Sequence, residues 1–172
     1  MTTDIKRILV PIDFSAASRR ALDQAVEIAL RFDATIHLIH VCDRPVIRAA
    51  LMDGYSLSPS EWRQQLGVNA EAQLAEIARR VRGVRVSTEV LFGRPAAVIV
   101  ETAATEDADL VVMGTHGHGA MMRVVLGSVA ERVVRSAPCA VLTVREPHAR
   151  EFERDIVRKL GFATTATLVA VR

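Results

Sequence analysis

The sequence alternates between short apolar runs and longer amphipathic segments, and this alternation limits the possible folds more than any other feature. The short runs lie at about 5–11, 35–42, 84–91, 110–113 and 140–144. Between them, apolar residues recur at helical spacing, as Ala21, Leu22, Ala25 and Ile28 do after the first run. Such an order is typical of successive βαβ units. It predicts an α/β fold, a three-layer α/β/α sandwich around a parallel sheet.

Residue types at the ends of these segments indicate where helices begin and which strands are central. Ser15 is a typical N-cap, and Pro59 suits a first helical turn. Ile8 to Val10 is continuously apolar, as expected for a central strand buried on both faces. The run at 84–91 alternates strictly, which favours a half-exposed edge strand. Helices are expected at about 15–32, 58–82, 94–106 and from 127 onward.

Composition and charge exclude several classes of protein. Hydrophobic residues make up 50% of the chain and charged residues 24%, so the chain can bury a core and is not a disordered type. The net charge is only +2 and the basic residues are scattered, so nucleic acid is not an expected partner. Neither a signal peptide nor an uncharged span of about 20 residues is seen, which predicts a cytoplasmic protein without a membrane partner. Cys42 and Cys139 lack zinc-binding spacing and are interpreted as reduced core thiols.

The glycine-rich stretch after the fourth apolar run is the strongest candidate for chemistry. Gly114 and Gly117 are followed, after nine intervening residues, by Gly127 and Ser128 at an expected helix start. Glycines let backbone amides approach an anion, and the N-terminus of a helix favours phosphate. A flexible connection with a C-cap and an N-cap would explain the same residues. The order of the glycines fits neither a Rossmann fingerprint nor a P-loop.

Topology places a second loop opposite this one. Parallel crossovers are right-handed, so a sheet covered on both faces must reverse its direction of growth at some point. The first and fourth strands are the most apolar and should be central neighbours. The loop at 11–15, which contains Asp13, would then face the loop at 114–127 at the switch point, where open α/β sheets bind ligands. Asp13 could instead be only a turn residue beside the helix start.

The spacing Gly114-x2-Gly117-x9-Gly127-Ser128 resembles the G-2x-G-9x-G-[S/T] motif of ATP-binding universal stress proteins. The opening ILVPIDFS at 8–15 and the closing GSVAERVVRSAPCAVLTVR at 127–145 resemble the same family. The resemblance covers about residues 4–145 and implies a five-stranded parallel sheet of order 3-2-1-4-5, of the adenine nucleotide alpha hydrolase type. Residues 1–145 would form this domain, with 146–172 as an extension.

The resemblance also implies a ligand and a set of binding residues. ATP or another adenine nucleotide is expected, with Asp13 near the ribose or a bound Mg²⁺ and Val41 meeting the adenine through its backbone. The remaining residues expected at the nucleotide are Pro11, Met113, Gly114, Thr115, Gly117, His118, Gly127, Ser128 and Val129. His118 stands where an arginine is common in the family, and Arg123 in the same loop could compensate.

No dedicated set of catalytic residues accompanies this site. Phosphoryl transfer needs a positioned water, a metal and stabilisation of developing charge. His116 and His118 are interpreted as exposed loop histidines, and His37 and His40 as satisfied histidines of the second strand. The leading hypothesis is therefore a dimeric, ATP-binding stress-response sensor or regulator acting on an unidentified protein partner. A nucleotide-independent interaction module and a weak ATP hydrolase are the alternatives.

The last 27 residues exceed what such a domain needs. A short helix from about Ala149, ending near Gly161, and a strand-like run at 163–171 are expected. The extension could pack back on its own domain or exchange onto a partner subunit. Because free edge strands invite pairing, and because the family commonly dimerises through its last strand, a homodimer formed through that strand and the extension is favoured.

Overall fold

The computed structural model describes residues 4–43, 59–115, 126–145 and 166–169. Its strands are β1 (Arg7–Pro11), β2 (Thr35–Asp43), β3 (Val86–Gly93), β4 (Leu110–Gly114), β5 (Ala140–Val144) and β6 (Ala166–Val169). Its helices are α1 (Ala16–Phe32), α3 (Pro59–Arg80), α4 (Pro95–Thr105) and α5 (Ser128–Ser136). Five parallel strands lie in the order β3-β2-β1-β4-β5, as expected.

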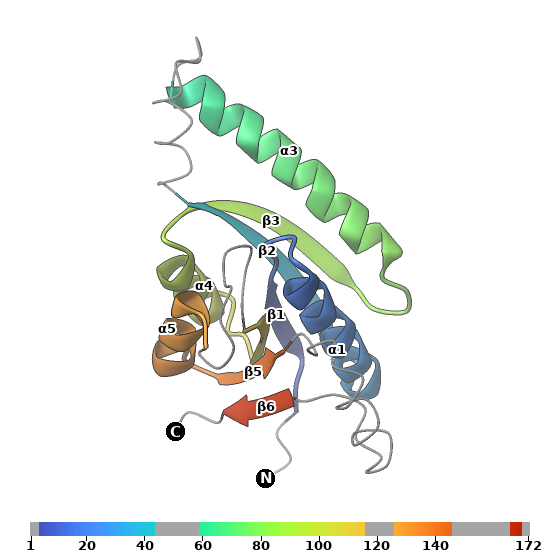
Figure 1. Ribbon diagram of the computed structural model, residues 1–172. Helices are drawn as coiled ribbons and strands as arrows, with labels where there is room; N and C mark the ends of the chain where they lie inside the picture. The colour runs from blue at the N-terminus through green and yellow to red at the C-terminus, as the bar shows by residue number, and fades with distance from the viewer. Residues whose placement is uncertain (1–3, 44–58, 116–125, 146–165, 170–172) are drawn as a thin grey trace, which may run out of the picture.

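Helices cover both faces of the sheet (Figure 1). α1 and α3 pack on one face, and α4 and α5 pack on the other. The predicted three-layer α/β/α architecture is therefore confirmed. The helices begin and end within about two residues of the expected positions. At α1, the Ser15 side chain caps the start of the helix, and Asp33 ends it in the left-handed conformation.

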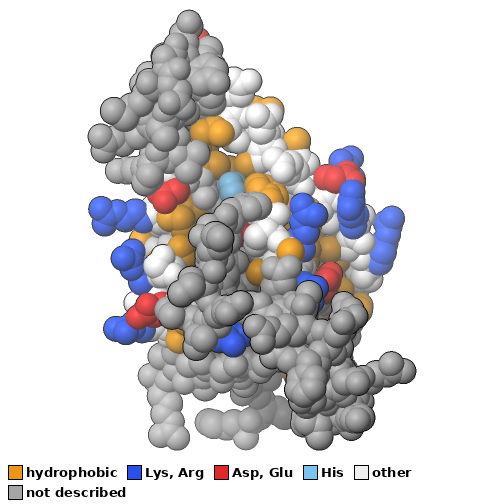
Figure 2. Space-filling view, viewed as in Figure 1, with side chains coloured by type: hydrophobic (Ala, Val, Ile, Leu, Met, Phe, Trp, Pro, Cys, Tyr) orange, Lys and Arg blue, Asp and Glu red, His pale blue; other side chains and the backbone are white. Residues whose placement is uncertain are grey.

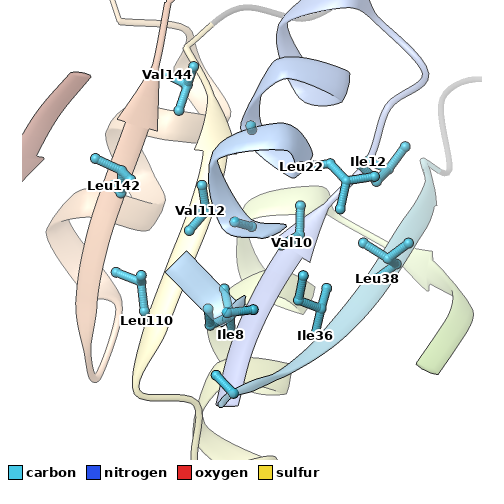
Figure 3. Close-up of a cluster of buried hydrophobic side chains, with 14 of the residues drawn as sticks. Ile8, Val10, Ile12, Leu22, Ile36, Leu38, Leu110, Val112, Leu142 and Val144 are labelled. Atoms are coloured by element: carbon cyan, nitrogen blue, oxygen red, sulfur yellow. The ribbon is translucent and has the colours of Figure 1, made fainter. Parts of the chain in front are cut away.

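Two apolar clusters, one on each face of the sheet, explain the continuous apolar run in β1. Ile8 and Val10 of β1 point to the α1 face, and Leu9 between them points to the α4–α5 face. All three side chains are at most 1% exposed. Figure 3 shows Ile8 and Val10 between side chains of β2 and β4, with the side chains of β5 beyond β4 and Leu22 of α1 close to Val10. Burial on both faces is what the continuous apolar run predicted.

β3 forms one edge of the sheet, as its alternating sequence indicated, and in the described residues its one strand partner is β2. Its outward residues Ser87 and Glu89 are exposed. Thr88, expected on the inner face, is also exposed, so the alternation of burial is less strict than that of residue types. The strand begins at Val86 rather than Val84 because Val84 precedes the ladder with β2.

The sixth strand belongs to the extension and joins the outer edge of the sheet. β6 pairs antiparallel with β5 of the same chain, in the register Val141 with Val169 through Val144 with Ala166. Residues 166–169 thus pair with their own domain in this single chain, as in the less favoured of the two alternatives, and exchange onto a partner subunit stays a prediction. The helix expected from Ala149 to Gly161 lies outside the described residues.

Candidate functional site

A pocket of about 440 Å³ opens at the carboxyl ends of the central strands. β1 lies between β2 and β4 in the sheet, so the residues that follow β1 and β4 meet at the predicted switch point. Ile39 and Val41 of β2, together with Ile99 of α4, give the pocket an apolar wall. Asp13 and Ser128 bring polar atoms to its lining. The volume and the mainly apolar lining are typical of small-molecule sites.

The turn after β1 positions Asp13. Its Oδ1 accepts hydrogen bonds from the Ser15 backbone N–H at 3.0 Å and from the Ser15 hydroxyl at 2.5 Å. Ser15 Oγ in turn accepts from the Ser18 backbone N–H at 3.2 Å and caps α1. Phe14 lies between them with φ 65°, a left-handed conformation that is uncommon for a bulky residue. Asp13 is therefore both a turn residue and a residue of the pocket.

Replacing Ser15 by alanine should lower the free energy of unfolding by about 1 kcal/mol, the usual cost of losing an N-cap side chain. The change removes the acceptor for the Ser18 N–H and one donor to Asp13. Urea denaturation followed by circular dichroism measures the loss. Threonine at this position keeps the hydroxyl and is the control; an equal loss in both variants would contradict the capping role.

His40 ties β2 to the same turn. Its Nδ1 lies 2.7 Å from the Ile12 carbonyl oxygen, and because a carbonyl only accepts, Nδ1 carries the proton and donates. The Phe14 ring lies over the imidazole, with centroids 4.5 Å apart. The Ile12 backbone N–H also donates to Ile39 O at 2.8 Å. Three contacts between β2 and the turn thus fix the mouth of the pocket.

The start of α5 forms the opposite side of the pocket. The first N–H groups of a helix have no carbonyl partner within it. Ser128, Val129 and Ala130 occupy these positions, and all three line the pocket. Gly127, the N-cap, offers them no side-chain acceptor, and its own N–H donates to Thr115 O at 2.8 Å. The helix start therefore directs several backbone donors and the positive end of its dipole toward the pocket.

Gly114 has a structural role beside the one that sequence suggested. A Cβ built at this position would lie 3.0 Å from the backbone carbon and the Cβ of Ala17 and 3.1 Å from Ser18 N. Side chains are thus excluded here because the first turn of α1 packs directly on the end of β4. The Thr115 N–H, next along the chain, donates to Val144 O at 3.0 Å.

The structure brings most of the expected binding residues together. The pocket is lined by Pro11, Asp13, Val41, Met113, Gly114, Thr115, Gly127, Ser128 and Val129. Gly117 and His118 lie outside the described residues. Whether these residues hold a nucleotide stays a prediction.

Sequence reasoning missed several lining residues, which are Ile12, Ser18, Ile39, His40, Pro95, Ile99 and Ala130. His40 was interpreted as a satisfied histidine, and its hydrogen bond agrees, but it also borders the pocket. The position of His40 next to Val41, near the end of the second strand, was a signal that could have predicted it as a pocket residue. Pro95 and Ile99 had no such signal, because only the packing of α4 beside β2 brings them there.

The two cysteines lie in apolar surroundings and are not joined in a disulfide. Burial raises the pKa of the Cys42 thiol, and burial together with the charge of Asp109 raises that of Cys139. Because the thiolate is the reactive form, a raised pKa leaves less of it at pH 8. We expect iodoacetamide to alkylate both thiols several times more slowly in the folded protein than in urea, as followed by mass spectrometry. Equal rates would contradict this.

Figure 2 shows hydrophobic side chains in the middle of the visible face and lysine and arginine side chains toward its margins. Within the ranges that the structure covers, no group of three His, Cys, Asp or Glu side chains is arranged to hold a metal ion. The helices of those same ranges are too short or too polar to cross a membrane.

Comparison with known proteins identifies the family. Residues 4–145 match the sequence model of the universal stress protein family. Universal stress protein MJ0531 of Methanocaldococcus jannaschii is 40% identical over 142 residues, which cover 83% of each chain. A putative universal stress protein of Staphylococcus haemolyticus is 32% identical over 156 residues, covering 88% of this chain and 92% of the relative.

Solved structures agree with the sequence comparison. The structure of the hypothetical protein MJ0577 is similar with a TM-score of 0.75 and 27% identity, over 85% of this chain and 99% of that one. The universal stress protein UspA of Lactobacillus plantarum gives a TM-score of 0.63 and 28% identity, over 82% and 98%. The chain belongs to the universal stress protein family.

Proposed function

We propose that the chain is an adenine-nucleotide-binding universal stress protein, a stress-response sensor or regulator that binds ATP in the pocket between β1, β2, β4 and α5. The observation that supports this most directly is the junction of an apolar wall with the start of α5 in one pocket of about 440 Å³. The apolar part suits a base and ribose, and the amides of α5 suit phosphates.

Relatives in the same family support the choice of ligand. Structural neighbours include a universal stress protein in complex with cAMP and the universal stress protein of Archaeoglobus fulgidus in complex with dAMP. Both ligands pair an adenine with phosphate, the combination that an apolar pocket beside a helix start suits. In our proposal Val41 meets the adenine, Asp13 lies near the ribose or a Mg²⁺ ion, and Gly117 and His118 belong to the same site.

The same proposal covers location, assembly and activity. We place the protein in the cytoplasm and expect its assembled form to be a homodimer through the last strand and the extension. Asp13 can offer an oxygen ligand to Mg²⁺ beside the phosphates, which is a common arrangement for this ion. Hydrolysis of ATP is the second candidate function, and it belongs to this site only if turnover depends on the Asp13 carboxylate.

Binding should be strongest for ligands that have phosphates. We expect calorimetry to give a lower Kd for ATP than for adenosine, and rising salt should weaken ATP binding more than adenosine binding, because α5 contacts the charged part. Mass spectrometry of denatured, freshly purified protein should also release an adenine nucleotide. Absence of heat with every nucleotide and of any bound nucleotide would instead favour the interaction module.

Turnover needs a separate measurement. Phosphate release with ATP and Mg²⁺ is compared between the wild type and Asp13→Asn, which keeps the size of the side chain. Slow release that disappears in the variant assigns hydrolysis to this site. Equal release in both assigns it to a contaminant and leaves the binding proposal intact.

A further inference from the structure

α3 has a row of exposed residues on the side that faces away from the sheet. Its residues Ala70 and Leu74 are buried, because α3 packs on β2 and β3. Figure 1 shows α3 along the outside of the molecule, with no other described helix or strand beyond it. Val68 is 56% exposed, and no large hydrophobic side chain in the described ranges is more exposed. The whole exposed row consists of Glu61, Gln65, Val68, Ala72, Ala75 and Arg79.

The spacing of this row is that of a helix-packing surface. Successive members are separated alternately by four and three positions along α3. This is the a/d heptad spacing by which two helices pack against each other along their length. The middle of the row, Val68, Ala72 and Ala75, is apolar, and its small side chains allow two helix axes to come close together. The row therefore suits packing against another helix.

The charges of the row fit a second copy of α3 that runs in the opposite direction. Glu61 lies in the first turn of the helix and Arg79 in the last. In an antiparallel pair centred midway between Val68 and Ala72, Val68 of each copy faces Ala72 of the other, and Glu61 faces Arg79. A parallel pair would instead place Glu61 against Glu61 and Arg79 against Arg79, and like charges repel. The row is therefore complementary to itself in the antiparallel arrangement.

Arg79 is accessible for such a contact. Its guanidinium lies 2.6 Å from the Glu76 carboxylate of the same helix, but 73% of its side chain is exposed. A guanidinium has five N–H donors, so one carboxylate does not use them all. Arg79 can therefore keep its contact with Glu76 and also bind Glu61 of another copy.

We propose that this row on α3 is a self-association surface, through which two copies of the chain pair with their α3 helices antiparallel. α3 covers β2 and β3, whereas β5 and β6 lie toward the opposite edge of the sheet. Pairing through α3 is therefore distinct from the dimer expected at the last strand, and both contacts can form at once. One helix pair buries less surface than a standard interface, so this contact is weak and needs a high protein concentration. The inference does not depend on nucleotide binding.

Charge reversal at the two ends of the row tests the proposal in the full chain. Glu61→Arg brings positive side chains together at both ends of the pair, and Arg79→Glu brings negative side chains together. Each change acts twice in a two-fold pair, so we expect either variant alone to raise the Kd of this association roughly tenfold or more. Mixed in equal amounts, the two variants should associate as the wild type does, because opposite charges then meet at both ends. Sedimentation velocity over a range of protein concentrations measures the association.

A control variant separates this contact from the effect of net charge. Glu101→Arg makes the same charge change at an exposed position of α4, outside the row, and should associate as the wild type does. Urea denaturation checks that every variant remains folded. A mixture that associates no better than the two single variants would overturn the proposal. The same Kd in the wild type and both single variants, or no association in the pure wild type beyond a last-strand dimer, would overturn it too, because the row would then serve a different protein or none.

Discussion

Replacing Ser128 by proline should weaken ATP binding roughly ten- to a hundredfold while leaving the fold unchanged. Ser128 is the first residue of α5 and is exposed. Proline is favoured at this position of a helix, and Gly127 before it has ψ 150°, which a following proline permits. The substitution therefore removes one N–H donor from the pocket without breaking the helix. A hydrogen bond to a charged group contributes about 1.5–3 kcal/mol, which gives the expected range.

Two further variants isolate the backbone donor. Ser128→Ala removes only the hydroxyl and should cost less affinity than proline does. Ala16→Pro makes the same backbone change at the first residue of α1, where Ser15 has ψ 164° and Ala16 is exposed. Calorimetry with ATP measures the three affinities, and urea denaturation checks that stability is unchanged. If Ser128→Pro binds ATP as the wild type does, the start of α5 is not the phosphate site.

The order and type of the elements could be predicted because local signals were unambiguous. Ile8 to Val10 form a continuous apolar run that suits a strand buried on both faces, and Ser15 marked the start of α1 by its side chain. The partner of β6 could not be predicted in the same way. A strand-like run indicates that a segment is extended. Strands pair through backbone N–H and C=O groups, which are the same in every sequence, so the run does not indicate its partner. Residues 163–171 thus indicated a strand without indicating which edge it joins.

The residues of the candidate site could be predicted where they lie near the end of a strand in the sequence. They could not be predicted where only the packing of a helix brings them to the pocket. Asp13 lies two residues after the end of β1, and Met113 is the last residue but one of β4, so their convergence followed from topology. Ile99 reaches the pocket only because α4 packs beside β2, and no local pattern encodes that contact. The glycine spacing predicts an anion site at Gly114, but no local pattern indicates that Ala17 of α1 lies 3.0 Å from the place of a Cβ at this position.

That close approach predicts that alanine destabilises the fold at Gly114, whereas alanine should stabilise it at Gly67. Gly114→Ala should lower the free energy of unfolding by about 1–3 kcal/mol, the usual cost of overpacking. The added Cβ meets the backbone of Ala17 and Ser18, which cannot rotate away. Removing glycine from a strand gains only about 0.5–1 kcal/mol, so the clash dominates. ATP affinity should fall as well, because the displaced turn of α1 is hydrogen-bonded to Asp13 through Ser15.

Gly67 in α3 is the matched control. A Cβ there would lie 3.4 Å from the Phe92 ring, an ordinary contact, and alanine is favoured over glycine inside a helix. Gly67→Ala should therefore raise the free energy of unfolding by about 0.5–1 kcal/mol and leave ATP binding unchanged. Urea denaturation of both variants shows whether each substitution raises or lowers the free energy of unfolding. Stabilisation by alanine at both positions would show that α1 can move away from β4 without cost, and the turn that holds Asp13 would then not depend on a glycine at 114.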